Sequence, residues 1–139
     1  MEIKDKISLS KVRLEYAKEA LKDAELLLKN DSYKASANRS YYAIFHSMRA
    51  VLALDGIDLK HHSGVISEFR RLYIKTKNFP TEMSDIITKL FKIRSDSDYK
   101  DFYILPKQDV RDQFANAGYF IKETEKFLKK RYKEILRKC

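Results

Sequence analysis

The sequence has 139 residues and contains three glycines, two prolines and no tryptophan, while hydrophobic and charged residues make up 44% and 35% of it. This size and balance exclude an intrinsically disordered chain and predict one helical domain spanning residues 1–139. The formal net charge of +9 favours phosphates, acidic proteins or anionic membrane surfaces as partners.

Hydrophobic periodicity predicts five helices joined by short turns. The first runs from about residue 9 to residue 29 with Ser8 or Ser10 as its N-cap, and the second runs from about residue 33 to residue 54. The third begins near His62 or Ser63 and stops before the break at residues 78–80. The last two cover about residues 81–97 and 107–136. With no strand pattern and short connections, we predict an all-α, up-down bundle of four to five helices.

The C-terminal helix carries much of the positive charge, because residues 122–139 include eight Lys or Arg and only three Glu. One alternative is a solvated helix face; another is a surface for an acidic partner or a phosphate. Its apolar residues fit the core of the bundle or a dimer seam, and a membrane surface is a further alternative. They are Phe127, Leu128, Tyr132, Ile135 and Leu136.

Cysteine and histidine usage gives no sign of a disulfide, metal or cofactor. The only cysteine is Cys139, expected to be an inert exposed thiol, and the three histidines lack the spacing of a zinc site. The longest apolar runs, 41–45 and 50–54, are too short to cross a bilayer, and the N-terminus lacks a signal-peptide pattern. We therefore expect a cytoplasmic protein without metal, cofactor or stable membrane association.

Arg94 breaks the apolar stripe of the fourth predicted helix. At about 100° per residue it falls on the same side as Met83, Ile87 and Leu90. A buried arginine needs a partner, and Asp98, one turn later, is the obvious one. The pair is either a structural ion pair that closes the bundle or part of an anion-binding site.

A second polar stripe follows the second predicted helix, where Arg39, Tyr42, His46 and Arg49 recur at spacings of three, four and three. The structural explanation of this stripe is a histidine whose hydrogen bonds are made within the fold, beside arginines that lie in solvent. Its functional explanation is phosphate binding, since arginine donates bidentate hydrogen bonds to phosphate oxygens.

A third cluster, Lys60-His61-His62-Ser63-Gly64, marks the start of the third predicted helix. It is either an ordinary capped loop with Ser63 as N-cap or a phosphate site at a helix N-terminus. In an up-down bundle the ends of helices two and four and the start of helix three share one end. We therefore predict a single basic pocket that Arg94, Asp98, His46 and residues 60–62 line together, with Arg39 farther away.

Three segments together resemble the HEPN family, and the resemblance covers about residues 17–127. Asn38 to His46 resembles the second HEPN helix, and residues 60–65 followed by Phe69 resemble the segment after it. Arg94-Ser95-Asp96-Ser97-Asp98-Tyr99 is similar to the Arg-x-x-x-Asp-Tyr ending of a prokaryotic subgroup. The resemblance implies a homodimeric helical bundle that frequently pairs with a small nucleotidyltransferase in toxin–antitoxin modules.

The family's active members are metal-independent RNases that use an arginine followed, after four to six residues, by a histidine. In this sequence Arg94 is followed at those positions by Tyr99, Lys100 and Asp101. Histidine titrates near neutral pH and can move protons, whereas tyrosine and lysine are poor bases there. His46 or His61 would have to substitute from another helix.

Three hypotheses follow. In the first, the chain binds RNA or nucleotide phosphates as the toxin-like partner of a nucleotidyltransferase: Arg94 holds a phosphate, Asp98 orients Arg94, and Tyr99 stacks or hydrogen-bonds. Arg39, Tyr42, Lys60, His61 and His62 would add binding contacts. In the second, it is an endoribonuclease with a relocated histidine, of which His46 is the candidate. In the third, it is a non-catalytic dimeric adapter.

Overall fold

Five α-helices make up most of residues 2–100 and 103–138, the part of the chain that this computed structural model describes. They are α1 (Ile3–Lys29), α2 (Tyr33–Ala53), α3 (His62–Phe69), α4 (Glu82–Tyr99) and α5 (Lys107–Arg137), and a π-helical turn, η1 (Arg70–Ile74), continues α3. These residues contain no strand, so the predicted all-α bundle is confirmed. Cys139 lies outside the described residues.

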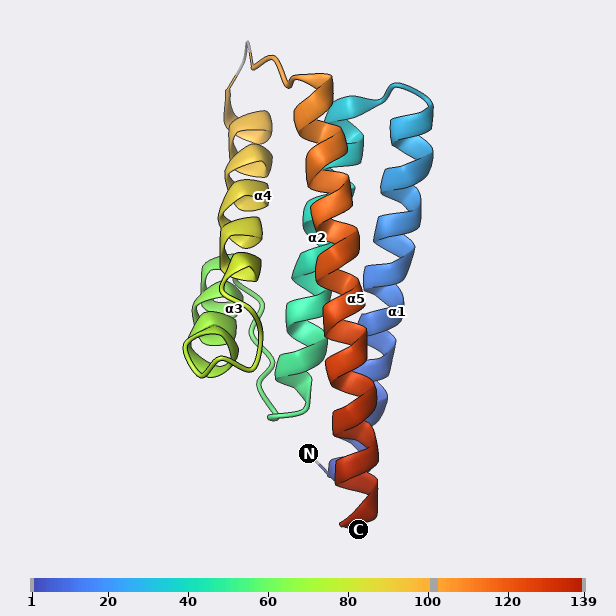
Figure 1. Ribbon diagram of the computed structural model, residues 1–139, viewed down its shortest axis with the longest axis vertical. Helices are drawn as coiled ribbons and strands as arrows, with labels where there is room; N and C mark the ends of the chain where they lie inside the picture. Colours follow the sequence, from blue (N-terminus) through green and yellow to red (C-terminus); the bar gives the residue numbers. More distant parts are fainter. Residues whose placement is uncertain (1, 101–102, 139) are drawn as a thin grey trace.

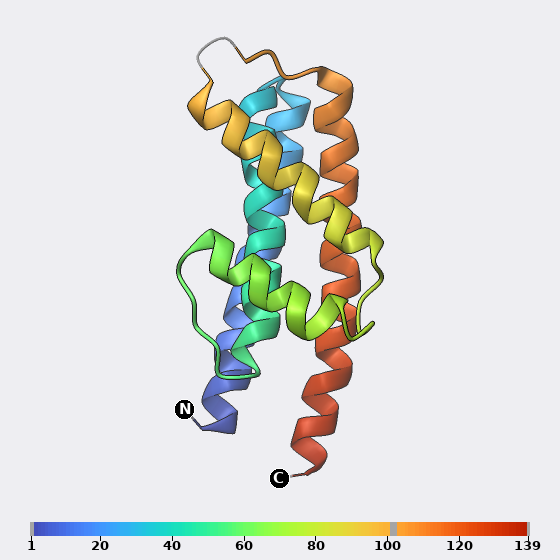
Figure 2. The same cartoon turned by 90° about the vertical axis from the view of Figure 1, so that its left-hand side faces the viewer.

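The central helix is α2, which packs against α1, α3, α4 and α5. Long helices α1, α2 and α5 run alongside one another, and α3 and α4 cross them obliquely (Figure 1; Figure 2). The predicted core stripe of α2 is fully buried or nearly so: Ala37, Tyr41, Ile44, Phe45, Met48 and Leu52. Each large apolar side chain of this kind contributes about 1.5–3 kcal/mol on burial, which makes α2 the main source of bundle stability.

Helix α1 begins six residues earlier than predicted, so the expected N-caps Ser8 and Ser10 are wrong. Glu2 is the N-cap, and Ile7 packs into the core. Ser10 lies inside the helix, fully buried, with its hydroxyl 2.6 Å from that of Tyr132 in α5. Tertiary packing against α5 therefore extends α1 beyond the point at which local capping residues predict its start.

The basic C-terminal part of α5 is packed against the bundle by its apolar side. Leu128 and Tyr132 are buried, and Phe127 and Ile135 pack at the edge of the core. Of its predicted apolar set, Leu136 alone is exposed. Most of this stripe therefore belongs to the bundle's own core. None of the described helices combines the length and hydropathy needed to cross a membrane.

Residues 54–61 return along α2 before α3 begins. Asp58 in this segment binds two arginines: Arg13 of α1 at 2.7 Å and Arg49 of α2 at 2.8 Å. The chain therefore reaches the middle of α2, where His62 stacks on Phe45 with ring centroids 4.3 Å apart. The N-cap of α3 is His61. The expectation that Ser63 is the N-cap is therefore wrong, because Ser63 lies inside the helix.

The direction of α4 differs from the prediction. Because α3 is short and lies across α2, α4 crosses diagonally and ends beside the beginning of α2 rather than beside its end (Figure 2). The expectation that the ends of helices two and four share one end of the bundle is therefore wrong. Arg94 and Asp98 lie beside Arg39, which the sequence argument had placed farther away.

Replacing Asp58 with alanine is expected to lower the free energy of unfolding by about 1–3 kcal/mol, because it leaves the buried Arg13 without its partner. Asp58 is itself half exposed, so the loss should stay below that of a fully buried pair. Urea unfolding followed by circular dichroism measures the effect. Asp23→Ala, an exposed carboxylate on α1, is the control; an equal loss in both variants would contradict the role given to Asp58.

Candidate functional site

A cleft of about 490 Å³ opens between the end of α1, the beginning of α2 and the end of α4. We call it the Arg39–Arg94 cleft. Its lining contains three cationic side chains and one carboxylate, which gives it an excess of positive charge. The lining residues are Leu27, Lys34, Ala35, Asn38, Arg39, Arg94, Ser97 and Asp98.

Arg94 is held mainly by aromatic rings. Its guanidinium carbon lies 5.3 Å from the ring centroid of Tyr41 and 5.7 Å from that of Tyr42. The expected partner Asp98 is present, but its Oδ2 lies 3.6 Å from Arg94 Nε, which is an ion-pair distance and too long for a hydrogen bond. Arg94 Nε is buried without a hydrogen-bond partner among the described residues. The two terminal nitrogens of Arg94 make no hydrogen bond among the described residues, so they, rather than the buried Nε, are the donors available to an incoming anion.

Arg39 stands over the same tyrosine. Its guanidinium carbon lies 4.9 Å from the Tyr42 ring centroid, and one terminal nitrogen donates to Asn38 Oδ1 at 3.3 Å. Tyr42 therefore holds two arginines within cation–π distance, and the Asp98 carboxylate in the same cleft pairs with Arg94 at 3.6 Å. This arrangement is suited to an anion with several oxygens, such as a phosphate, because each arginine presents a fork of N–H donors.

His62 lies next to this cluster. Its Nδ1 is 2.6 Å from the Tyr41 hydroxyl, and its ring stacks on Tyr41 and Phe45. Burial and the charges of Arg94 and Arg49 lower the pKa of His62, so its neutral form is favoured. Burial also raises the pKa of Tyr41, which keeps the hydroxyl protonated.

The tautomer of His62 follows from Tyr41. We assign the Tyr41 hydroxyl as the donor to Nδ1, because it makes no other hydrogen bond among the described residues. Neutral His62 then carries its proton on Nε2 and is a hydrogen-bond donor there. In this state it can bind an anion but cannot accept a proton at Nε2.

His46 lies on another flank of α2, between Tyr16 and Tyr42, with ring centroids 5.8 Å and 6.0 Å away. Burial, together with the charges of Arg49, Arg39 and Arg13, lowers the pKa of His46 to about 4. Its Nδ1 is buried without a hydrogen-bond partner in the described part of the chain. Both histidines therefore adjoin the tyrosine rings that carry Arg94: the His62 ring stacks on Tyr41, and the His46 ring contacts Tyr42.

The other predicted site residues lie at the surface. Lys60 and His61 are exposed and do not line the Arg39–Arg94 cleft. Tyr99, at the end of α4, is 80% exposed. Within residues 2–100 and 103–138, no three His, Cys, Asp or Glu side chains are placed to hold a metal ion together.

Sequence reasoning missed Lys34, Asn38 and Ser97, which complete the cleft lining. Ser97 Oγ is buried and lacks a hydrogen-bond partner among the residues described. Sequence reasoning also missed Arg13, which binds Asp58. The helical periodicity of α1 could have found it, because Arg13 falls on the same line as Ala17, Ala20 and Ala24. A charged residue on a buried line indicates a buried ion pair.

Comparisons with known proteins find a matching family and several similar sequences. The family model described as "HEPN domain" matches residues 10–134. The chain is 34% identical over 112 residues to a "UPF0332 protein" of Thermotoga maritima, covering 81% of this chain and 85% of the relative.

Two similar proteins come from Methanocaldococcus jannaschii. One, named "Putative toxin MJ0142", is 29% identical over 128 residues, which are 92% of this chain and 86% of the relative. The other, named "Putative toxin MJ0605", is 34% identical over 126 residues, which are 88% of each chain.

Stability is expected to fall as the pH decreases from about 6.5 to about 4. The pKa of His46 is about 4 in the folded protein, below the usual 6.5, so the unfolded chain binds the proton more readily in this window. The lowered pKa of His62 acts in the same direction. Urea midpoints at pH 7, 5.5 and 4.5 measure the effect, and His46→Phe should flatten the decline.

His61→Gln is the matched control for this pH series because its side chain is exposed. It should preserve the decline. A decline that is the same in His46→Phe as in the unaltered protein would rule out a role for His46.

Proposed function

The chain belongs to the HEPN family, and we propose that it is the toxin-like subunit of a toxin–antitoxin pair and binds RNA through phosphates held in the Arg39–Arg94 cleft. The observation that carries this proposal is the placement of two arginines over one tyrosine ring, with no carboxylate hydrogen-bonded to either among the residues that the structure describes. Cationic donors of this kind bind phosphate oxygens strongly.

The surroundings of the two arginines support the same function. Lys34 adds a third cation, and Asn38 and Ser97 add neutral hydrogen-bonding groups at the cleft wall. Neutral His62 is a further donor beside Arg94. Asp98 would orient Arg94 through its 3.6 Å ion pair, and Tyr99, exposed one residue later, is available for stacking on a base.

The proposed partners rest on the family and its named relatives. Two similar proteins carry the name of a toxin, which supports an antitoxin partner for this chain. Because HEPN subunits frequently pair with small nucleotidyltransferases, we propose such a protein as the antitoxin and a homodimer as the functional form.

One observation favours a second candidate function, metal-independent RNA cleavage: His62 lies in the aromatic cluster under Arg94, where a relocated histidine would be needed. The hydrogen bond from Tyr41 argues for binding, since it leaves a proton on His62 Nε2 and no free base there. We therefore place binding first and cleavage second. A non-catalytic adapter is the remaining alternative.

Arg94→Gln and Arg39→Gln are each expected to weaken binding of single-stranded RNA about tenfold or more, in line with the loss of a charge-assisted hydrogen bond. Each should also reduce the salt dependence of binding by about one phosphate contact. Fluorescence anisotropy of a labelled RNA at several salt concentrations measures both effects. Lys4→Gln, an exposed cation at the start of α1, changes the net charge equally and serves as the control.

If Arg94→Gln lowers stability but leaves RNA affinity unchanged, the arginine is structural and the adapter function is favoured instead. Thermal unfolding of each variant, measured beside the binding assay, separates the two results.

Incubation of labelled RNA with the purified protein in EDTA is expected to leave the RNA intact, because His62 in its donor tautomer cannot act as a general base. Gel electrophoresis of the RNA measures cleavage. Cleavage that disappears in both Arg94→Ala and His62→Ala, but persists in His46→Ala, would establish the RNase function and overturn the order given above.

A further inference from the structure

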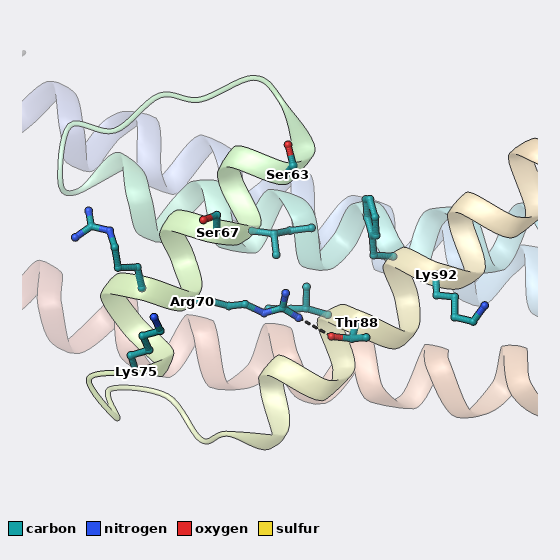
Figure 3. Close-up of a pocket in the computed structure, with 10 residues that line it drawn as sticks. Ser63, Ser67, Arg70, Lys75, Thr88 and Lys92 are labelled. Atoms are coloured by element: carbon teal, nitrogen blue, oxygen red, sulfur yellow. Dashed lines mark hydrogen bonds between the residues drawn. The ribbon is translucent and has the colours of Figure 1, made fainter.

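A second and larger cleft, of about 610 Å³, lies between α3 with η1 on one side and α4 on the other (Figure 3). We call it the α3–α4 cleft. Its volume falls within the range of small-ligand sites, and no part of the proposed function uses it. The lining residues are Ser63, Ile66, Ser67, Arg70, Arg71, Lys75, Ile87, Thr88, Phe91 and Lys92.

One cation of this cleft is held in a fixed position. Arg70 reaches from η1 to α4, where its Nε donates to Ser84 Oγ at 2.9 Å and one terminal nitrogen donates to the Ser84 carbonyl at 3.0 Å. The same terminal nitrogen donates to Thr88 Oγ1 at 2.6 Å (Figure 3). The other terminal nitrogen makes no hydrogen bond within the described chain. These bonds are to neutral groups, so the guanidinium keeps its full charge and a free donor for an anion.

The rest of the lining divides into an apolar part and a polar rim. Ile66, Ile87 and Phe91 supply apolar surface, while Ser63, Ser67 and Thr88 supply hydroxyl groups. Arg71 and Lys92 are each paired with a neighbouring acid, Glu68 and Asp96, whereas Arg70 has no acidic partner among the residues described. A planar ring with polar edges, attached to an anion, matches this distribution: the ring contacts Phe91 and the anion contacts Arg70.

The α3–α4 cleft lies close to Arg94 along the same helix. Phe91 precedes Arg94 by three residues, which is about one helical turn and about 4.5 Å of rise. Thr88, which binds Arg70, precedes Phe91 by a further turn. The Phe91 ring is also 6.0 Å from that of Tyr41, over which Arg94 lies. Arg94, Phe91 and the Arg70–Thr88 pair therefore form a row of cation, aromatic ring and cation.

We propose that the α3–α4 cleft is a base-binding subsite for the single RNA strand whose phosphate is held by Arg94: one unstacked base lies on Phe91, and the following phosphate is bound by Arg70. This inference rests on the proposed function. It excludes a duplex as the preferred substrate, because paired bases are stacked inside the helix and cannot enter the cleft.

An acidic protein segment is a weaker match to this cleft. An amphipathic helix needs an apolar groove that receives side chains at i, i+3 or i+4 and i+7. The apolar lining here consists of three side chains, enough for one ring. The serine and threonine hydroxyls are also suited to the polar edge of a base.

The test compares an intact single-stranded RNA with a strand of equal length that carries abasic nucleotides, using fluorescence anisotropy at one salt concentration. The unaltered protein should bind the intact strand more tightly, about 5-fold or more, since stacking of one base contributes about 1–3 kcal/mol. Phe91→Leu should reduce this preference and leave binding of the abasic strand nearly unchanged. Arg70→Lys should weaken binding of both strands.

Tyr16→Leu, which removes an aromatic ring from the exposed side of α1, is the matched control and should leave the preference unchanged. Circular dichroism of each variant checks that it is folded. Equal binding of intact and abasic strands by the unaltered protein, or equal weakening of both by Phe91→Leu, overturns the subsite and leaves the cleft to an acidic protein. Absence of any RNA binding by the unaltered protein overturns the proposed function itself, which distinguishes the two failures.

Discussion

The two ion pairs of Asp58 with Arg13 and Arg49 tie the segment before α3 to α1 and α2, and the path of α3 and α4 starts from there. Since the segment 54–61 is held against α1 and α2, the chain enters α3 beside the middle of α2. The short α3 then turns into an α4 that crosses α2 toward its beginning. If residues 54–61 did not run back along α2, Arg94 and Arg39 would not line the same cleft, and His62 would not stack on Phe45.

The electrostatics of the site differ from those of an ordinary structural ion pair. A buried arginine is usually satisfied by a carboxylate, whereas Arg94 rests on two tyrosine rings and has only a 3.6 Å contact with Asp98. Cation–π contacts hold the guanidinium in place and leave its donors available. Burial is the main cause of the lowered pKa values of His46 and His62, and neighbouring arginines, Arg49 in both cases, lower them further. Such a site attracts anions and keeps its histidines neutral.

The similarity to two proteins named as putative toxins is consistent with a positively charged site that holds neutral histidines. Active HEPN RNases need a histidine near the arginine, and in this chain the residue that lies closest to that role comes from the start of α3 rather than from the end of α4. The Nδ1 of this histidine, His62, lies 2.6 Å from the Tyr41 hydroxyl. The proposed binding function therefore depends on residues of α2, α3 and α4 together.

The sequence by itself determined the helices and the core, because a helical stripe depends on residues three or four positions apart. The buried set of α2, from Ala37 to Leu52, was available from periodicity. Periodicity also singled out Arg94, which the structure leaves half-buried over the rings of Tyr41 and Tyr42. The HEPN resemblance, too, was carried by local segments. Tertiary structure alone decided which of these residues meet. Asp58 and Arg13 are 45 residues apart, Tyr41 and His62 are 21 apart, and the diagonal path of α4 results from such long-range contacts, which no local pattern contains.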